Sequence, residues 1–214
     1  MSDSAVRNLT ALFSRIAEAM ESAEDRLSDL DGAIGDADHG ISMALGFKAV
    51  VAELSHPRHD LSSASAVMNV VAIAFLNAVG ASIGPLYATA FRQAAQSLAG
   101  VQEIDRAAIT IMLQAIATGI RERGKGQRGD KTMLDAWLPA AEAAALAQTR
   151  NLVGPAFWQE VVSAAEHGAN ATSSMVAVRG RAARVGERSL GHVDPGAASA
   201  VIILKAMAEA LPAV

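Results

Sequence analysis

The chain has 214 residues, a formal net charge of −4 and no cysteine; 51% of its residues are hydrophobic and only 4% are aromatic. Without cysteine, disulfides and thiol chemistry are excluded, and the scattered basic residues give no electrostatic reason to expect nucleic-acid binding. A core of Ala, Val, Leu, Ile and Met is typical of closely packed helices, so we expect an all-α protein with a single domain over 1–214.

Eight helices are predicted from apolar residues at helical spacing and from boundary signals. They are expected over about 6–20, 43–54, 62–79, 85–98, 105–123, 131–149, 155–175 and 195–211. Asp130 is expected to cap the sixth helix and Asp194 the eighth, and Pro139 should kink the sixth.

No segment predicts a membrane span. The most hydrophobic run, 70–76, is bounded by Asn69 and Asn77. It is far shorter than the roughly 20 residues that a transmembrane helix needs. The first residues, Met-Ser-Asp-Ser, lack the basic region of a secretory signal. We therefore expect a cytoplasmic protein that makes no contact with a membrane.

Helices of this length with mostly short connections favour an antiparallel up-and-down bundle or closed barrel. In that arrangement the connections after the odd-numbered helices lie at one end. These connections are 31–40, 80–84, 124–130 and 179–195, and they hold the glycine-rich and charged segments. Because the loops of a rigid scaffold carry its functional groups, we expect a site at that end.

The segment 31–40, DGAIGDADHG, places Asp31, Asp36 and Asp38 among three glycines. Three nearby carboxylates repel one another unless a cation lies between them, and an all-oxygen set suits Mg²⁺, Mn²⁺ or Ca²⁺. An EF-hand is excluded, because the twelfth position counted from Asp36 is Phe47 rather than Glu. A loop in which Asp38 merely caps the next helix is the alternative. The convergence of four glycine-bearing loops favours a metal and phosphate site.

Four sequence blocks stand in or beside these loops. They are D-x3-GDADHG at 31–40, GASIGPLY at 80–87, GDKTMLDA at 129–136 and GRAARVGERS-x-GH-x-DPG at 180–196. In this order they resemble the ADP-binding L subunit of dihydroxyacetone kinase, which also occurs as the C-terminal domain of one-chain ATP-dependent kinases. The resemblance covers nearly the full chain. It implies an eight-helix antiparallel barrel that holds a nucleotide at one end.

The resemblance also implies roles for particular residues. Asp31, Asp36 and Asp38 match the ligands of two Mg²⁺ ions that bridge the nucleotide phosphates. Positions that match nucleotide contacts are His39, Gly40, Ile41, Ser42, Ala81, Ser82, Gly124, Met133, Arg181, Asp194, Pro195 and Gly196. No residue is assigned as a general acid or base, because phosphoryl transfer depends mainly on positioning and electrostatics.

Some of these positions have a second, structural interpretation. Met133 is also a candidate core residue, and Asp194 is suited to capping a helix while it contacts nucleotide. Ile83 departs from the small or hydroxylated residues of many relatives and offers no hydroxyl. Ser82 or bare backbone amides must then supply the phosphate contact of that loop.

The resemblance implies a kinase subunit that passes the γ-phosphoryl group of bound ATP to dihydroxyacetone, or a similar short ketose, held on a partner K subunit. In the phosphotransferase-linked form, ADP stays bound as a coenzyme, and a phosphohistidine-bearing subunit rephosphorylates it in place. One alternative is an ATP-exchanging subunit that acts on a tetrulose such as erythrulose. Another is a nucleotide-bound regulatory module that binds a transcriptional activator. The sequence leaves the oligomeric state open, and a homodimer is compatible with it.

Overall fold

The computed structural model describes residues 4–59 and 61–213. Within these ranges the chain is helical and has no β-strand, which confirms the all-α prediction. The α-helices are α1 (Ser4–Ser22), α2 (Glu24–Gly32), α3 (His39–Leu54), α4 (Ala64–Ala78), α5 (Ile83–Ser97), α6 (Arg106–Gly124), α7 (Leu134–Thr149), α8 (Gly154–Ala171) and α9 (Pro195–Ala210). Two 3-10 segments, η1 (Thr172–Ser174) and η2 (Ala182–Ser189), lie between α8 and α9. None of the described helices combines the length and hydropathy that crossing a bilayer requires.

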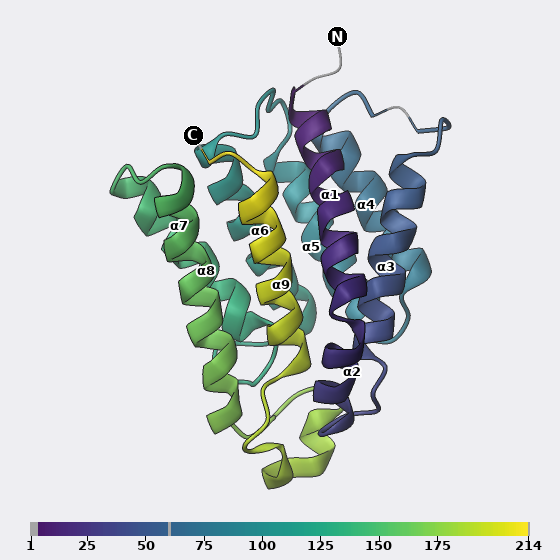
Figure 1. The fold of residues 1–214 in the computed structure, drawn as a ribbon, viewed down its shortest axis with the longest axis vertical. Helices are drawn as coiled ribbons and strands as arrows, with labels where there is room; N and C mark the ends of the chain where they lie inside the picture. The colour runs from purple at the N-terminus through teal and green to yellow at the C-terminus, as the bar shows by residue number, and fades with distance from the viewer. Residues whose placement is uncertain (1–3, 60, 214) are drawn as a thin grey trace.

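The long helices close into a ring (Figure 1). They pack in the order α1, α3, α4, α5, α6, α7, α8 and α9, and α9 packs back against α1. Most connections in this ring are short, which makes successive helices antiparallel; the connection from α8 to α9 is long and spans 172–194. The closed ring confirms the predicted eight-helix up-and-down barrel, with α2 as an additional short helix.

The α2 helix is an element that the sequence patterns did not predict. A break at Ala23 (φ −105°, ψ 2°) separates it from α1, and it packs against α3. Asp31 belongs to its last turn, so the expected loop 31–40 is shorter than predicted and spans only 33–38. One acid of the candidate metal site is therefore held by a helix, and the other two lie on a loop.

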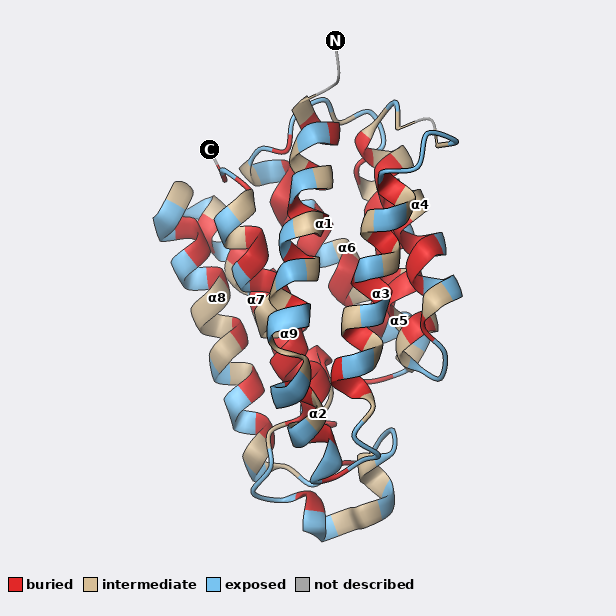
Figure 2. Cartoon of the chain, turned by 45° about the vertical axis from the view of Figure 1, so that its right-hand side comes forward, coloured by how far each residue is buried: buried red, intermediate tan, exposed pale blue. Residues whose placement is uncertain are grey.

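The few aromatic side chains gather inside the barrel. Rings from α1, α3, α4 and α5 form one cluster, with centroids between 5.1 and 6.5 Å apart. Its members are Phe13, Phe47, Phe75, Tyr87 and Phe91, all of them buried. Figure 2 shows the same trend, because the buried parts of the ribbon face the barrel axis. Aromatic rings bury more area than other side chains, so this cluster fixes how the four helices pack.

The two predicted helix caps had different outcomes. Asp194 caps α9 as predicted, since its Oδ2 accepts a hydrogen bond from the Ala197 N–H at 2.8 Å. The prediction for Asp130 was wrong: α7 begins only at Leu134, and the Asp130 carboxylate accepts a hydrogen bond from the Gln127 N–H instead. That carboxylate closes the turn before the helix rather than capping the helix.

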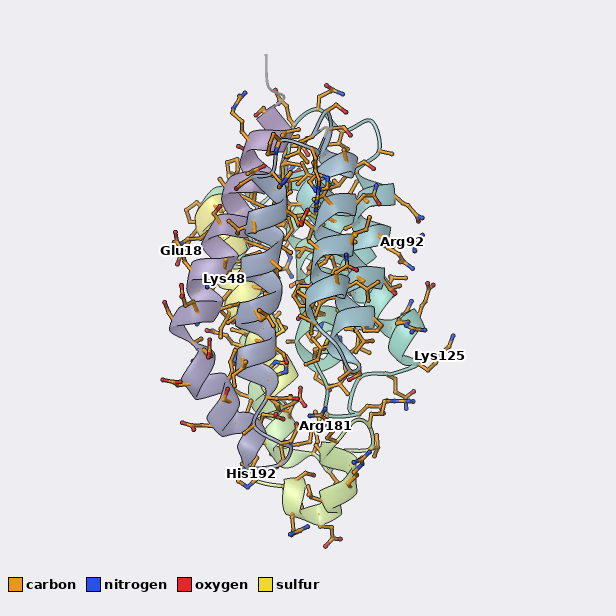
Figure 3. All side chains as sticks on the ribbon, turned by 90° about the vertical axis from the view of Figure 1, so that its right-hand side faces the viewer. Glu18, Lys48, Arg92, Lys125, Arg181 and His192 are labelled. Atoms are coloured by element: carbon orange, nitrogen blue, oxygen red, sulfur yellow. The ribbon has the colours of Figure 1, made fainter. Side chains whose placement is uncertain are left out.

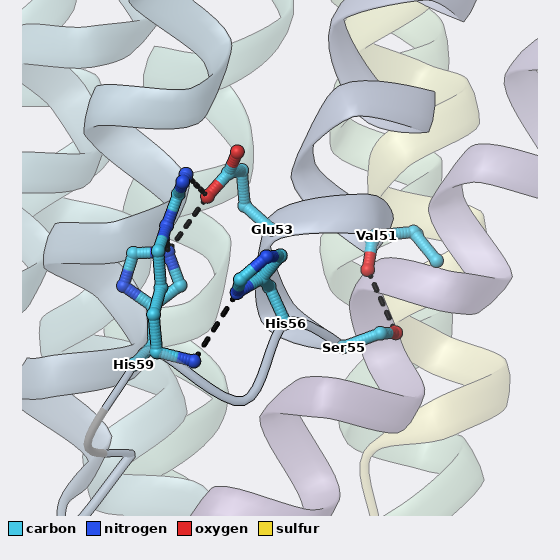
Figure 4. A network of polar contacts seen from close by, with 6 residues as sticks. Val51, Glu53, Ser55, His56 and His59 are labelled. Atoms are coloured by element: carbon cyan, nitrogen blue, oxygen red, sulfur yellow. Dashed lines mark hydrogen bonds and ion pairs between the residues drawn. The ribbon is translucent and has the colours of Figure 1, made fainter.

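The connection between α3 and α4 lies at the end of the barrel opposite the glycine-rich loops (Figure 1), and Figure 4 shows its polar contacts. Glu53 Oε2 lies 2.7 Å from His59 Nε2 and pairs with the Arg58 guanidinium. The Arg58 N–H donates to His56 Nδ1 at 3.2 Å. These polar contacts fix residues 55–59 of this connection, which contain no glycine.

Gly119 of α6 marks a close approach to α5, because a Cβ at this position would lie 2.7 Å from Ala90 Cα. We predict that Gly119→Ala lowers the free energy of unfolding by about 1–3 kcal/mol, since the two helices must separate. Helix propensity alone would predict the opposite result, because alanine is favoured over glycine inside a helix by about 1 kcal/mol. Urea unfolding measures the difference. Gln114→Ala, at an exposed position of α6, should stay within about 0.5 kcal/mol; an equally stable Gly119→Ala variant would contradict the close packing.

Candidate functional site

The predicted loops do lie together, at the lower end of the barrel in Figure 1. They surround a cavity of about 540 Å³. The residues singled out from the sequence that line it are Asp31, Asp36, Asp38, His39, Ser42, Ala81, Ser82, Gly124, Met133, Arg181, Asp194, Pro195 and Gly196. Segments that are far apart in the sequence thus form one concave site.

Gly40 and Ile41 do not line this cavity. Gly40 is buried where α3 crosses α2, and a Cβ there would overlap the Glu24 carbonyl oxygen and lie 2.6 Å from Ser28 Oγ. The Ile41 side chain is 54% exposed. The glycine is therefore required for helix packing, and any contact of these two residues with a ligand is left to their backbone.

Asp31 joins α2 to α3. Its Oδ2 accepts hydrogen bonds from the N–H groups of Asp38, at 3.0 Å, and His39, at 3.3 Å. Asp38 stands at the N-cap position of α3 without a side-chain cap bond. The alternative interpretation, in which Asp38 caps the next helix, thus placed the helix start correctly. The carboxylate that accepts the N–H groups there is that of Asp31, not that of Asp38. Gly35 permits the arrangement, because a Cβ there would overlap Asp31 Oδ1.

The three acids form a cluster with the donor chemistry of a hard-cation site. Asp31, Asp36 and Asp38 each bring one carboxylate oxygen within 4.8 Å of the others. Asp31 is buried, whereas the other two face the cavity from the loop. Burial, and then the charge of Asp31, raise the pKa of Asp38. A cation among these oxygens relieves their repulsion.

In this structure the positive charge near the cluster comes from Arg181. Its Nη1 forms an ion pair with Asp36 and lies 2.8 Å from Asp38 Oδ2. Arg181 belongs to the segment between α8 and α9, and Figure 3 shows it and His192 at the same end of the molecule. The guanidinium thus ties this segment to the acidic loop, and its side chain is within reach of anionic groups in the cavity.

Three loops around the cavity contain non-glycine residues in a left-handed backbone conformation, which is unfavourable for residues with a Cβ. These are Ala37 (φ 62°), Ala81 (φ 51°) and Lys131 (φ 59°). Non-glycine residues with such φ values store strain that the surrounding structure must maintain, and they concentrate at functional sites. Lys125 (φ 51°), in the same connection as Lys131, shares this conformation, and so do Asn151 and Ala213, which do not line the cavity. The strained positions are thus frequent around the cavity without being confined to it.

Lys131 is a cavity residue that sequence reasoning missed. Its side chain is almost fully buried, and its ammonium donates to the carbonyl oxygens of Thr172, at 2.6 Å, and His192. Burial lowers its pKa, while the charges of Asp194 and Asp135 oppose that shift. Its position inside the block 129–136 could have indicated that it lies in the site. Lysine is usually exposed, however, which argued against a buried role.

The remaining wall of the cavity is largely apolar. Its apolar residues include Ile34, Ile83, Pro85, Leu86, Ile120, Met133 and Leu134. Met133 is both a core residue and a lining residue, so its two predicted roles coexist. A cavity with an acidic cluster at one side and apolar side chains at the other suits a ligand with a flat hydrophobic part and a polar tail.

His39 is buried beside the acids. Its Nε2 lies 2.9 Å from Ser199 Oγ. Burial lowers its pKa to about 4, against the opposing charge of Asp31. The ring is therefore neutral at physiological pH and adds no positive charge to the cluster.

Asp194 is largely buried, and burial raises its pKa to about 7 although the Ala197 N–H and Lys131 favour the charged form. Because the folded-state pKa lies above the unfolded value of 3.8, folding is favoured by protonation. That contribution is complete below the unfolded pKa and is lost as the pH rises through about 7.

We predict that Asp194→Asn removes this pH dependence, because asparagine keeps the cap without a charge. The stability of the wild type relative to the variant should fall by up to about 4 kcal/mol between about pH 4 and pH 8. Urea unfolding of both proteins at several pH values measures the difference and cancels the titration of other groups. A constant difference across this range would show that Asp194 is charged throughout.

The family described as the DAK2 domain matches residues 33–209. The chain belongs to the DAK2-domain family. It is 36% identical over 196 residues to the ADP-binding subunit of the PEP-dependent dihydroxyacetone kinase of Escherichia coli K12, covering 92% of each chain. It is 30% identical to the L-erythrulose 1-kinase of Mycolicibacterium smegmatis, over 96% of this chain and 36% of that protein.

A solved structure with the same fold is the dihydroxyacetone kinase of C. freundii in complex with AMP-PNP and Mg²⁺. The TM-score is 0.71 at 25% identity, over 94% of this chain. The chain spans about a third (33%) of that longer kinase. The DAK2-domain relatives described here are kinases or kinase subunits, and one of them is described with a nucleotide analogue and magnesium.

Proposed function

We propose that this chain is the ADP-binding, phosphoryl-transferring subunit of a cytoplasmic dihydroxyacetone kinase. The observation that carries the proposal is the joining, in one cavity, of the carboxylate cluster and the apolar wall. The relation to an ADP-binding kinase subunit, at 36% identity over nearly the whole chain, supports the same assignment.

The acid cluster fits magnesium. Asp31, Asp36 and Asp38 would hold two Mg²⁺ ions, because hard divalent cations are bound by carboxylates together with phosphate oxygens. When bound, such ions neutralise the charge that develops on the phosphoryl oxygens. The chain's own part is to hold the carboxylates close together, which Asp31 does by accepting the N–H groups at the start of α3.

The rest of the cavity positions the nucleotide. Its base and ribose would lie along the wall that contains Gly124 and Met133, and its phosphates would face the acid cluster. Ser82 precedes the first residue of α5, so its hydroxyl and nearby backbone N–H groups are suited to a phosphate. Arg181 would add a guanidinium contact to a phosphate oxygen. The segment 194–196 would close the pocket beside the ribose.

The phosphoryl acceptor would be dihydroxyacetone, or a similar short ketose, held on a separate K subunit. ADP would then remain bound as a coenzyme and receive a new phosphoryl group from a phosphohistidine-bearing subunit. The higher identity to PEP-dependent ADP-binding subunits than to erythrulose kinases supports this version. Two alternatives compete with this assignment. One is an ATP-exchanging subunit of an erythrulose kinase, and the other is a regulatory module without transfer activity.

The metal assignment is tested by Asp36→Ala. We predict at least a tenfold loss of affinity for Mg²⁺-ADP, measured by isothermal titration calorimetry, with an unchanged circular-dichroism spectrum. Asp29→Ala is the matched control, because Asp29 is an exposed carboxylate on α2 outside the cluster. Equal affinity in Asp36→Ala and the wild type would remove Asp36 from the site.

The coenzyme assignment is tested by native mass spectrometry of the gently purified protein before and after incubation with excess ATP. We predict a retained mass of ADP with two Mg²⁺ that does not exchange. Reversible loading with ATP would favour the nucleotide-exchanging kinase. A protein that binds no nucleotide would overturn the proposed function.

A further inference from the structure

The α4 helix lacks the charged outer face that a solvent-exposed helix normally has. Among the α-helices in the described ranges, it is the one whose sequence contains no Asp, Glu, Lys, Arg or His. Its exposed positions are nevertheless occupied by Asn69, Ile73, Leu76 and Asn77. Ile73 is 60% exposed and Leu76 is 46% exposed. A helix on the outside of a barrel ordinarily places charged residues at such positions.

The neighbouring helix, α3, extends this apolar surface. Ile41 and Leu45 are 54% and 52% exposed, and they lie one turn apart on the same face of α3. A Cβ at Gly46 would meet the side chains of Phe75 and Val79, so the part of α3 that carries Leu45 packs against the last turn of α4, close to Leu76 in the chain. We call the surface formed by Ile41, Leu45, Ile73 and Leu76 the α3–α4 patch. Single exposed apolar residues are ordinary, whereas a contiguous group indicates an interface.

The α3–α4 patch lies close to residues that line the cavity. Ile41 precedes the lining residue Ser42, and Leu76 lies four residues before the lining residue Gly80. At 1.5 Å per helical residue, the whole patch lies within about 10 Å of the cavity-lining ends of α3 and α4. Farther from the loops, α3 carries Lys48, which Figure 3 shows away from Arg181 and the cavity end. The apolar surface is thus confined to the part of these helices near the site.

We infer that the α3–α4 patch is the docking surface for the protein that carries the phosphoryl acceptor; this inference rests on the proposed function. Transfer requires the acceptor oxygen to approach within about 3–3.5 Å of the phosphorus, so an acceptor-carrying protein must cover the cavity mouth. A specific interface buries about 800 Å² on each partner. A body seated over the mouth extends onto the adjacent helix ends, where apolar anchors contribute most of the binding energy.

The double variant Leu45→Lys/Ile73→Lys tests this inference, because neither residue lines the cavity. It is compared with Leu146→Lys, a similarly exposed apolar residue (49%) on α7. The assay follows phosphoryl transfer to dihydroxyacetone with the purified cognate ketose-binding subunit at increasing concentration. We expect the subunit concentration for half-maximal rate to rise at least tenfold in the double variant, with the rate at saturation and the retention of ADP unchanged. Leu146→Lys should behave like the wild type.

Each other outcome has a definite meaning. Transfer by the double variant with unchanged subunit dependence would overturn the docking inference and leave the proposed function intact. Absence of transfer by the wild type would overturn the proposed function, and the inference with it. Light scattering of the isolated chain supplies the remaining distinction: a wild-type dimer that the double variant converts to a monomer would assign the patch to a second copy of this chain instead.

Discussion

The Asp31 carboxylate is the contact on which the rest of the site depends. It stands on the last turn of α2 and accepts the N–H groups that begin α3, so one side chain joins two helices at the barrel end. The same carboxylate contributes an oxygen to the acid cluster. Because it is buried and hydrogen-bonded, it holds its position while Asp36 and Asp38 approach it from the loop. The repulsion that results must be met by a positive charge, which Arg181 supplies in this structure.

Buried charges connect the remaining loops to this centre. Lys131 binds the carbonyl groups that end α8 and precede α9, and Asp130 pairs with Arg179 at 2.6 Å. These contacts tie the α6–α7 connection to the long segment that carries Arg181. A buried ion or polar group requires its partners to stay in place, so the loops are positioned with respect to one another although few of their residues belong to regular helices.

The barrel and the site place different demands on the same helices. Inside, the aromatic cluster packs α1, α3, α4 and α5 closely together. Outside, α3 and α4 leave apolar side chains exposed near the ends that line the cavity. The inner surface is explained by folding, whereas the exposed part of the outer side chains is not buried by any described part of the chain. The contrast between the two faces of α4 is what makes the outer surface informative about a partner.

The amino-acid sequence by itself determined the helical class, the order of eight long helices and the three acids of the cluster. It could do so because each of these features is set by residues close together in the chain: the spacing of apolar residues defines a helix, and glycines and neighbouring carboxylates mark the loop. It did not predict α2, because that short helix has little periodic apolar character and is held by packing on α3. It also misassigned the helix caps at Asp38 and Asp130, because groups elsewhere in the fold take part in the hydrogen bonds. At the start of α3, the Asp31 carboxylate accepts the backbone N–H groups in place of Asp38. The Asp130 carboxylate instead binds Arg179, 49 residues away. The burial of Lys131 and the exposure of the α3–α4 patch were likewise decided by tertiary structure, because both depend on which segments become neighbours when the ring closes.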